Sequence, residues 1–380
     1  MHFVIDRDIF VQNVNHVSKA VSSRTTIPIL TGIKVVADHE GVTLTGSDSD
    51  ISIETFIPLE EGDRQNVEVK QEGSIVLQAK VFAEIVKKLP EQEIEIHVQD
   101  SFVTTIRSGS SVFNLNGLDP DEYPRLPVLE EDHVFRLPQK ILKDIIRQTV
   151  FAVSAQETRP VLTGVNFEIE DGILTCTATD SHRLAMRKVP VEKNDDELQF
   201  SNVVIPGKSL NELSKILDEN EELLDIVVTE NQTLFKLKNM LFFSRLLEGK
   251  YPVTKNMIPK EAKTSFAVHT KAFLQTLERA LLLSREGKNQ VINLKTLGDG
   301  VVEVTAITPE IGKVTENVAT QGLEGEELRI SFNGKNVIDA LKVVDSESIH
   351  IAFTGAMSPF VLSPTDHDQS LHLFSPVRTY

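Results

Sequence analysis

A repeat inside the chain constrains its fold more than any other feature. Residues 28–32 read Pro-Ile-Leu-Thr-Gly, and residues 160–164, 132 positions later, read Pro-Val-Leu-Thr-Gly. Gly41-Val-Thr-Leu-Thr, which leads to Asp48, is matched by Gly172-Ile-Leu-Thr-Cys, which leads to Asp180. A match that keeps its register over dozens of residues indicates that one domain has been copied within the chain.

A third copy completes the pattern. The copies open with Phe3-Val-Ile-Asp, Phe135-Arg-Leu-Pro and Phe266-Ala-Val-His, and three copies of about 125 residues account for nearly all of the chain. We therefore predict three domains of one kind, at residues 1–127, 128–255 and 256–380. After each opening, positions spaced 4, 3 and 4 residues apart lie on one helical face. These positions are Phe10, Val14, Val17 and Val21; Leu142, Ile146, Thr149 and Val153; and Phe273, Leu277, Ala280 and Ser284.

Each copy has the same internal plan. A first helix is followed by alternating strands, such as residues 42–45 and 51–57, and later by strands such as 93–98 and 223–228. Strict alternation of apolar and polar residues favours antiparallel sheet with one face in water. Two helices packed on such strands make an α+β domain. The second helices are expected over Ile75–Leu89, Lys208–Leu217 and Lys335–Val344.

Proline-rich joints separate the copies. They are residues 119–127 and 251–259, in which Tyr123-Pro124 and Tyr251-Pro252 form an aligned pair. Proline restricts its own backbone, so short joints of this kind are stiff. We expect them to hold neighbouring domains in fixed relative orientations.

Composition indicates a soluble globular protein. The chain is 40% hydrophobic and 25% charged, and no apolar run approaches membrane-spanning length. Its opening residues do not resemble a secretory signal. The single cysteine, Cys176, rules out a disulfide within the chain. Together these features predict a cytoplasmic protein.

Charge is distributed unevenly. The formal net charge is −17, but the six windows expected to hold helices carry +6 and the remainder carries −23. Mildly basic helices and acidic strands suggest one surface that accepts a polyanion and another that repels it. A simpler interpretation stays open, because lysine is also common in helices for its propensity.

Reactive residue types are densest at Asp180-Ser181-His182-Arg183. Neighbouring residues do not make a catalytic triad, and no nucleophile elbow surrounds Ser181. A turn bonded to its own backbone is the favoured interpretation. The first copy has Asp48-Ser49-Asp50-Ile51 at the same place, so only the second copy carries His-Arg-Leu. This difference hints at a role that belongs to the second copy alone.

Other motifs point away from catalysis. Pro206-Gly-Lys-Ser209 lacks the preceding glycine of a phosphate-binding loop and is interpreted as a helix start. Asp366-His-Asp368 supplies too few ligands for a closed metal site and is interpreted as a solvated turn. No dinucleotide fingerprint and no cysteine cluster occurs. We expect no active site, no cofactor and no metal.

Three consecutive leucines, residues 281–283, have a different implication. Only part of such a triplet can face the core of its own helix, so one or two leucines should point outward. A covered helix remains possible, and a subunit contact is the favoured interpretation.

These residues together resemble the family of bacterial DNA polymerase III beta subunits, the sliding clamps. The resemblance rests on the triple repeat, the Pro-x-Leu-Thr-Gly strings, Ala178-Thr-Asp-Ser-His-Arg-Leu-Ala185 and the closing Ser375-Pro-Val-Arg378, and it spans the whole chain. It implies DNA-clamp domains and a head-to-tail homodimer that forms a six-domain ring, with helices lining the hole and antiparallel sheets outside. It also implies a processivity factor that encircles duplex DNA without sequence preference and catalyses nothing, although the family is often classified with the polymerase as a nucleotidyltransferase.

The resemblance further implies a pocket between the second and third domains for short linear peptides. Its users would be the replicative polymerase, the clamp loader and other clamp-binding proteins. By motif position, the pocket residues are Arg159, Leu162, Thr179, His182, Arg183, Leu184, Pro252, Met257, Asn333, Met357, Ser375, Pro376, Val377 and Arg378. Pro160 and Val161 stand where some members of the family have two aromatic residues.

The resemblance assigns two further sets of residues. Arg24 and Gln156, with Lys208 as an additional candidate, match positions that touch duplex DNA. Phe113, Leu282 and Leu283 match the dimer interface, in agreement with the argument from the leucine triplet.

Two alternatives stay open at this point. One is an enzyme that uses the region 180–183, in which His182→Ala would abolish turnover and leave peptide binding intact. The other is a repeat scaffold that binds proteins and never encloses DNA, which would treat linear and circular DNA alike.

Overall fold

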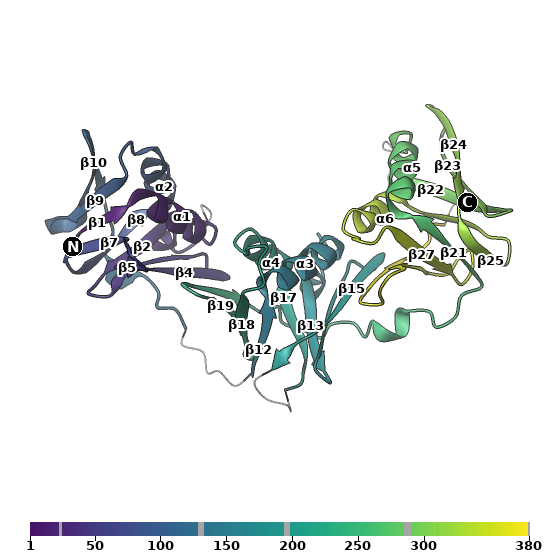
Figure 1. Cartoon of the computed structure of the whole chain (residues 1–380), viewed down its shortest axis with the longest axis horizontal. Coiled ribbons are helices and arrows are strands. Elements are labelled where there is room, and N and C mark those ends of the chain that lie inside the picture. The colour runs from purple at the N-terminus through teal and green to yellow at the C-terminus, as the bar shows by residue number, and fades with distance from the viewer. Residues whose placement is uncertain (23–24, 128–132, 194–197, 285–289, 310, 379–380) are drawn as a thin grey trace. The chain divides into compact units, whose positions relative to one another are not determined.

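The structure, a computed structural model, describes residues 1–380 except 23–24, 128–132, 194–197, 285–289, 310 and 379–380 (Figure 1). The chain forms two compact units. Unit 1 comprises Met1–Lys140, Lys193–Asp195 and Asn211–Leu246, and unit 2 comprises Ile141–Glu192, Asp196–Leu210 and Leu247–Tyr380. The first copy of the repeat therefore lies in unit 1 and the third in unit 2, while the second copy is divided between them.

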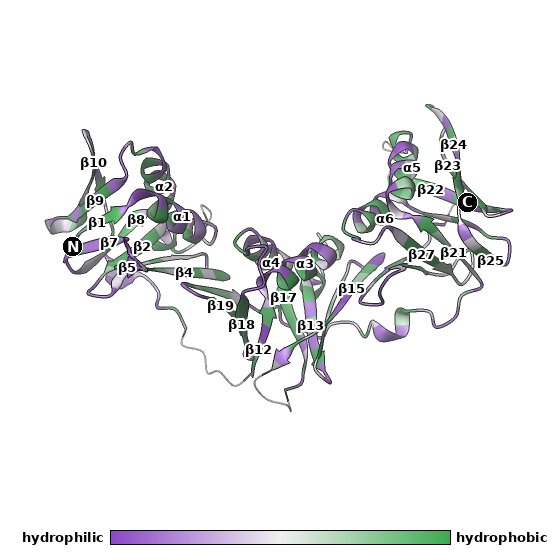
Figure 2. Ribbon diagram, viewed as in Figure 1, coloured by the Kyte–Doolittle hydropathy of each residue, from purple (hydrophilic) through white to green (hydrophobic). Residues whose placement is uncertain are grey.

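Two α-helices begin in each copy, as the repeat predicts. They are α1 (Arg7–Ser18), α2 (Ala79–Lys88), α3 (Gln139–Thr149), α4 (Gly207–Ser214), α5 (Thr270–Leu282) and α6 (Gly334–Leu341). Each carries both hydrophilic and hydrophobic residues (Figure 2), as a helix with one buried face requires. None of the described helices is both long and apolar enough to cross a membrane.

The predicted inward faces of the first helices are confirmed. Phe10, Val14 and Val17 of α1 are buried, and the matching positions of α3 and α5 are buried as well. Phe10 contacts the rings of Phe3 and Phe82 edge-on, at centroid distances of 6.2 and 5.8 Å. The opening strand and both helices of the first copy thus share one core.

The predicted bounds of the second helices were wrong at their ends. The first of them begins at Ala79, not Ile75, because Ile75-Val76-Leu77 lies in strand β8 (Gly73–Gln78). β-Branched residues favour strand over helix, and all three side chains are buried. In the other two copies the helix ends at Ser214 and Leu341, three residues before the predicted ends.

Unit 1 holds a nine-stranded sheet in the order β16-β12-β18-β19-β20-β4-β3-β2-β8 and a five-stranded sheet in the order β11-β10-β9-β1-β7. The strands of these sheets, with the pair β5 and β6, are β1 (His2–Asp6), β2 (Gly32–Ala37), β3 (Gly41–Ser47), β4 (Ile51–Pro58), β5 (Glu60–Glu61), β6 (Arg64–Gln65), β7 (Val67–Gln71), β8 (Gly73–Gln78), β9 (Glu93–Val98), β10 (Val103–Ser108), β11 (Ser111–Asn116), β12 (His133–Pro138), β16 (Glu192–Lys193), β18 (Leu223–Val228), β19 (Gln232–Leu237) and β20 (Met240–Arg245).

Unit 2 holds a second nine-stranded sheet in the order β17-β13-β14-β15-β29-β28-β27-β21-β25 and a four-stranded sheet in the order β24-β23-β22-β26. Their strands are β13 (Gly164–Glu170), β14 (Ile173–Thr179), β15 (Arg183–Pro190), β17 (Phe200–Pro206), β21 (Thr264–His269), β22 (Val291–Gly298), β23 (Val301–Thr308), β24 (Gly312–Ala319), β25 (Gln321–Gly325), β26 (Arg329–Asn333), β27 (Ser348–Phe353), β28 (Phe360–Pro364) and β29 (Ser370–Phe374).

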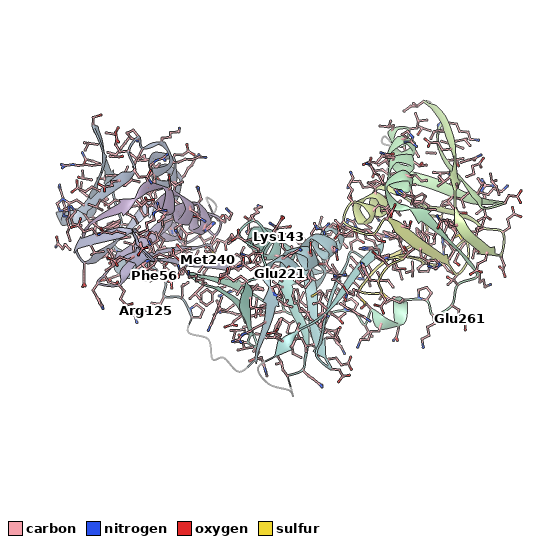
Figure 3. All side chains as sticks on the ribbon, viewed as in Figure 1. Phe56, Arg125, Lys143, Glu221, Met240 and Glu261 are labelled. Carbon is pink, nitrogen blue, oxygen red and sulfur yellow. The ribbon has the colours of Figure 1, made fainter. Side chains whose placement is uncertain are left out.

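The copies are joined by strand pairing as well as by their joints. Strand β4 of the first copy pairs with β20 of the second, and β15 of the second pairs with β29 of the third. We call these contacts the first seam and the second seam. Figure 3 labels Phe56 and Met240 at the first seam, where the Phe56 N–H also donates to the Asn239 carbonyl at 2.9 Å. Each nine-stranded sheet therefore runs through two copies.

The repeated Pro-x-Leu-Thr-Gly string forms a short 3-10 turn before a strand. The turns are η1 (Pro28–Thr31) and η5 (Pro160–Thr163), and in each the threonine hydroxyl donates to the proline carbonyl, at 2.8 and 2.7 Å. A Cβ at Gly32 would lie 2.4 Å from Val76 Cγ1, and one at Gly164 would lie 2.6 Å from the Ile205 carbonyl oxygen. Close approach of the neighbouring strand therefore explains the glycine in both copies. The other short 3-10 turns are η2 (Asp100–Phe102), η3 (Pro120–Glu122), η4 (Val150–Ala152) and η6 (Lys255–Met257).

Candidate functional site

The Asp180–Arg183 segment is the turn that the sequence predicts. Asp180 Oδ1 accepts hydrogen bonds from the backbone N–H groups of His182 and Arg183, at 2.9 and 3.0 Å, and Ser181 has a φ of 76°. In the first copy, Asp48 Oδ1 accepts hydrogen bonds from the backbone N–H groups of Asp50 and Ile51 in the same way, at 3.1 and 2.9 Å. The aspartate and serine therefore shape a β-hairpin turn in both copies.

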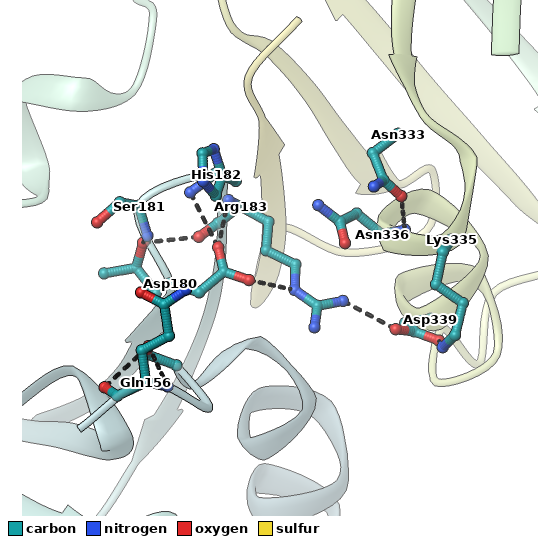
Figure 4. A network of polar contacts seen from close by, with 11 residues as sticks. Gln156, Asp180, Ser181, His182, Arg183, Asn333, Lys335, Asn336 and Asp339 are labelled. Atoms are coloured by element: carbon teal, nitrogen blue, oxygen red, sulfur yellow. Dashed lines mark hydrogen bonds and ion pairs between the residues drawn. The ribbon is translucent and has the colours of Figure 1, made fainter. Parts of the chain in front are cut away.

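Arg183 connects this turn to the third copy (Figure 4). Its Nε lies 3.0 Å from Asp180 Oδ2, and its Nη1 lies 2.9 Å from Asp339 Oδ2 on α6. The side chain is only 13% exposed, and its guanidinium carbon lies 5.3 Å from the centre of the Phe151 ring. Arg183 thus bridges two copies of the repeat, and Lys335 of α6 also pairs with Asp339.

The C-terminal segment crosses between the same two copies. The Ser375 N–H donates to the His182 carbonyl at 2.9 Å, and the Val377 N–H donates to the Ser331 carbonyl at 2.8 Å. Pro376 forms an isolated bridge with Phe332. His182, Ser375, Pro376 and Val377 are therefore brought together, beside Arg183, by the backbone itself.

Two apolar clusters of unit 2 contain predicted pocket residues. Leu162 packs with Val204 and Tyr251, with Val161 and Leu247 at its margin. Leu184 packs with Met186 and Leu373 across the second seam, and Ile258 and Val361 border that cluster. Thr179, at the end of β14, is buried. Leu162 and Leu184, the predicted apolar pocket residues on the strands and turns of the second copy, are thus buried in these clusters.

The remaining predicted pocket residues differ in their surroundings. Arg159 and Arg378 are exposed, Pro252 is half-buried, and Met257 and Met357 are 48% and 58% exposed on turns. Asn333 serves as the N-cap of α6, because its side-chain oxygen accepts the Asn336 N–H at 3.1 Å. Sequence reasoning missed Asp339 and Phe151, since no local pattern marks a residue that meets Arg183 from another copy.

The predicted DNA-contacting residues are placed only in part. Arg24 lies outside the described residues. Gln156 is exposed, and its backbone N–H donates to Ser154 Oγ at 3.0 Å. Lys208 is exposed in the first turn of α4. Helix α4 begins at Gly207, so residues 206–209 form a helix start, as the sequence indicates.

The predicted interface residues lie on exposed edges. Phe113, on edge strand β11, is 40% exposed. At the end of α5, Leu281 is buried, Leu282 is 57% exposed and Leu283 is half-buried. The expectation that part of the leucine triplet points outward is confirmed.

A buried histidine lies at the second seam. His372 of β29 pairs with Ala185 of β15, and neither ring nitrogen has a hydrogen-bond partner in the described part of the chain. Its ring centre lies 5.7 Å from that of Phe151. Burial lowers the pKa of His372 to about 4, so the imidazole is neutral at pH 7.

Comparison with known domain families identifies every copy of the repeat. Residues 1–127 match the DNA polymerase III beta subunit, N-terminal domain; residues 136–253 match its central domain; and residues 255–378 match its C-terminal domain.

Relatives match over their full length. The "Beta sliding clamp" of Bacillus subtilis (strain 168) is 58% identical over 380 residues, and that of Staphylococcus aureus (strain N315) is 49% identical, each comparison covering 100% of both chains. The crystal structure of the DNA polymerase sliding clamp from Bacillus subtilis superposes with a TM-score of 0.97 at 57% identity. That of the DNA polymerase III beta chain from Streptococcus pneumoniae TIGR4 superposes with a TM-score of 0.94 at 39% identity, and both structures cover 100% of each chain.

Proposed function

Because the chain belongs to the family of DNA polymerase III beta subunits, the beta sliding clamps, we propose that it encircles duplex DNA and tethers the replicative polymerase to it. In this proposal the three copies act as clamp domains with the bounds 1–127, 128–255 and 256–380. The protein confers processivity and catalyses nothing. It acts where the chromosome is replicated, in the cytoplasm.

The strand pairing at the seams is the observation that carries the ring. In the repeat, β4, β15 and β24 occupy one position, and β11, β20 and β29 occupy another. Within the chain, β4 pairs with β20 and β15 pairs with β29. The remaining pair, β24 and β11, consists of two sheet-edge strands. A third seam between β24 of one subunit and β11 of the next is head-to-tail, and such contacts close when the rotation per domain completes a circle.

Two chains with six domains complete this ring, as the family implies. Phe113 lies on β11, and Leu282 and Leu283 lie at the end of α5, so apolar side chains border the proposed third seam. Their exposure in the single chain fits a surface that a second subunit covers.

The helices supply the inner surface. Lys80 and Lys87 of α2 are exposed and lie seven residues apart, hence on one helical face. Lys208 of α4 is exposed as well, and Arg24 and Gln156 complete the proposed DNA contacts. Basic groups that meet phosphates hold DNA without reading its sequence, and an acidic exterior repels it elsewhere.

Enclosure explains processivity. A ring needs few direct contacts to stay on DNA, so it can slide over any sequence. A polymerase bound to the ring remains at a high effective concentration beside the primer end.

Partner proteins dock, in this proposal, on the second-seam side of unit 2. An apolar anchor settles near Leu162, Leu184, Pro252 and Met257, and polar groups of the turn and the C-terminal segment fix the peptide backbone. His182 and Arg183 have no counterpart in the first copy. In this proposal that difference is the reason why the pocket forms at the second seam and not at the first. The full set of proposed residues is Arg159, Leu162, Thr179, His182, Arg183, Leu184, Pro252, Met257, Asn333, Met357, Ser375, Pro376, Val377 and Arg378.

A primer-extension assay tests the function. The template is a singly primed circle, with a polymerase and a clamp loader from the same source, ATP and a trap for released polymerase. Adding the protein should lengthen the products made before the polymerase is lost to the trap by about tenfold or more. A polymerase that lets go of the primer end stays tethered to the ring and binds the same end again. Unchanged product length with an active loader would contradict the proposal.

A further inference from the structure

Edge strand β17 has a bulge at Asn202. The register of β17 against β13 shifts between Phe167 and Ile169, so that Ser201 and Asn202 lie opposite a single residue, Glu168. Asn202 has a φ of 61°, in the left-handed region that a residue with a Cβ rarely adopts. A bulge of this kind changes the direction of the side chain it carries, and its backbone persists where further contacts hold it.

Both ends of the Asn202 amide bind the chain where the second joint, residues 251–259, begins. Asn202 Nδ2 donates to the Gly249 carbonyl at 2.9 Å, and Asn202 Oδ1 accepts the Tyr251 N–H at 2.7 Å. One end of the amide donates and the other accepts, so the side chain fits in a single orientation. Gly249 has a φ of 116°, which glycine adopts without strain. Asn202 therefore fixes two successive peptide groups at a bend of the chain.

The fixed segment leads directly into the proposed docking pocket. The side chain of Tyr251 is buried and packs with Leu162 and Val204. Pro252 follows it, and Met257 lies five residues further on, in η6. Leu162, Pro252 and Met257 are the residues against which a partner's apolar anchor settles in the proposal above. Binding is tighter when such walls are in place before the partner arrives.

The other two copies are built differently at this point. Ser74 of β8 and Arg329 of β26 stand at the same place as Asn202, each four residues before the end of its strand. Both lie in unbroken strand pairing, with β2 and β22 respectively. In the described part of the chain, the bulged asparagine thus belongs to the second copy, as the His-Arg-Leu string does. The copy that carries the proposed pocket is the one that also fixes the joint beside it.

We infer that Asn202 is a positioning residue for partner docking, which holds the start of the second joint against β17 and so presets the pocket walls that Pro252 and Met257 supply. This inference rests on the proposed pocket at the second seam. Asn202 acts through Gly249 and Tyr251 and does not itself contact the partner. A joint released from Asn202 adopts further arrangements, so a partner meets a binding-competent pocket in only a fraction of its encounters.

Binding kinetics of the full chain with the replicative polymerase from the same source, measured by biolayer interferometry, test the inference. Asn202→Gly keeps a backbone that accepts the bulge and removes both hydrogen bonds. Its association rate should fall about fivefold, the equivalent of one hydrogen bond, because fewer encounters find the pocket formed. Its dissociation rate should stay within about twofold, since the bound state keeps its contacts. Met257→Ala removes a wall of the pocket instead and should mainly raise the dissociation rate.

A matched control and a direct measurement of the joint complete the experiment. Ser201→Gly adds a glycine to the same bulge but leaves both hydrogen bonds of Asn202, so its kinetics should equal those of the parent chain. Asn202→Asp keeps the acceptor for the Tyr251 N–H, loses the donor to Gly249 and should fall between the two. Hydrogen exchange of the Tyr251 amide should be about fivefold faster in Asn202→Gly and unchanged in Ser201→Gly. A residue that only stabilised the fold would lower the melting temperature without the change in association rate.

The outcomes separate this inference from the proposed function. Weakened binding in Met257→Ala together with parent-like rates in Asn202→Gly would overturn the inference and leave the pocket in place. A loss of affinity in Asn202→Gly that lies only in the dissociation rate, or that Ser201→Gly shares, would overturn it as well. Unchanged binding in both Met257→Ala and Asn202→Gly would overturn the pocket and the inference together.

Discussion

Arg183 and Met257 both belong to the proposed docking pocket, but their surroundings differ. Arg183 is largely buried between Asp180 and Asp339, whereas Met257 is 48% exposed. We expect Arg183→Ala to lower the free energy of unfolding of unit 2 by about 2–3 kcal/mol, because two carboxylates lose their shared partner. Met257→Ala should change stability by less than about 0.5 kcal/mol and still weaken a docking peptide.

Thermal unfolding and peptide titration of the two variants check this division. Arg183→Lys is the control for charge, since it keeps the cation and loses the two-sided geometry. Equal stability of Arg183→Ala and the parent chain would contradict the bridging role. Unchanged peptide affinity in Met257→Ala would move the pocket elsewhere.

We expect His372 to make the second seam sensitive to acid. Its pKa is lowered to about 4 by burial, so between that value and the usual 6.5 the unfolded chain binds a proton that the folded chain does not. Stability should therefore rise with pH through this window and fall on acidification, by up to about 3 kcal/mol from this one group. His372→Leu should flatten this part of the profile.

Melting temperatures at about pH 5 and about pH 7.5 measure the effect. The difference between the two values should be smaller for His372→Leu than for the parent chain. An identical difference would show that His372 is not buried in its neutral form.

At the scale of single elements, the end of α5 presents apolar surface next to the proposed third seam. Leu282→Asp combined with Leu283→Asp should convert dimers to monomers, because burying two charges costs several kcal/mol. Sedimentation velocity gives the oligomeric state. Ile173→Asp on β14 of the second copy, where the isoleucine is 39% exposed, is the control and should remain dimeric. A dimeric double variant would rule out this seam.

Variants of the basic face of α2 distinguish direct contact with DNA from enclosure of DNA by the ring. Lys80→Glu with Lys87→Glu replaces two positive charges on one helical face with two negative ones, so direct DNA affinity at low salt should fall severalfold and depend less steeply on salt. The lifetime of the protein on closed circular DNA should stay within about twofold, since enclosure does not rest on those contacts. A lifetime that falls in parallel with affinity would indicate ordinary surface binding.

Local patterns predicted the elements where the pattern itself decides the structure. The inward positions of α1, such as Phe10 and Val14, followed from helical spacing, and the Asp180 turn followed from side-chain chemistry. The start of α2 did not, because Ile75-Val76-Leu77 suits either a buried strand or a helix and only its pairing with β2 resolves the choice. Asp339 was missed for a similar reason, since its partner Arg183 lies 156 residues away.

At the scale of the whole molecule, the repeat predicted three copies but not how they connect. The joints were expected to fix the copies, whereas the structure adds strand pairs between β4 and β20 and between β15 and β29. Edge-strand pairing depends on which strands are left open after each copy folds, and sequence periodicity does not report that. β24 and β11 are left as edge strands of their sheets, and in the proposed ring they pair with each other between subunits.

Retention on DNA of different topology tests the enclosing ring most directly. The protein is loaded onto nicked circular plasmid with a clamp loader and ATP, the complex is isolated, and the circle is then cut once. We expect the protein to be released on linearisation, because a ring slides off a free end. Retention on the linear product would contradict enclosure, and with it the third seam and the processivity role.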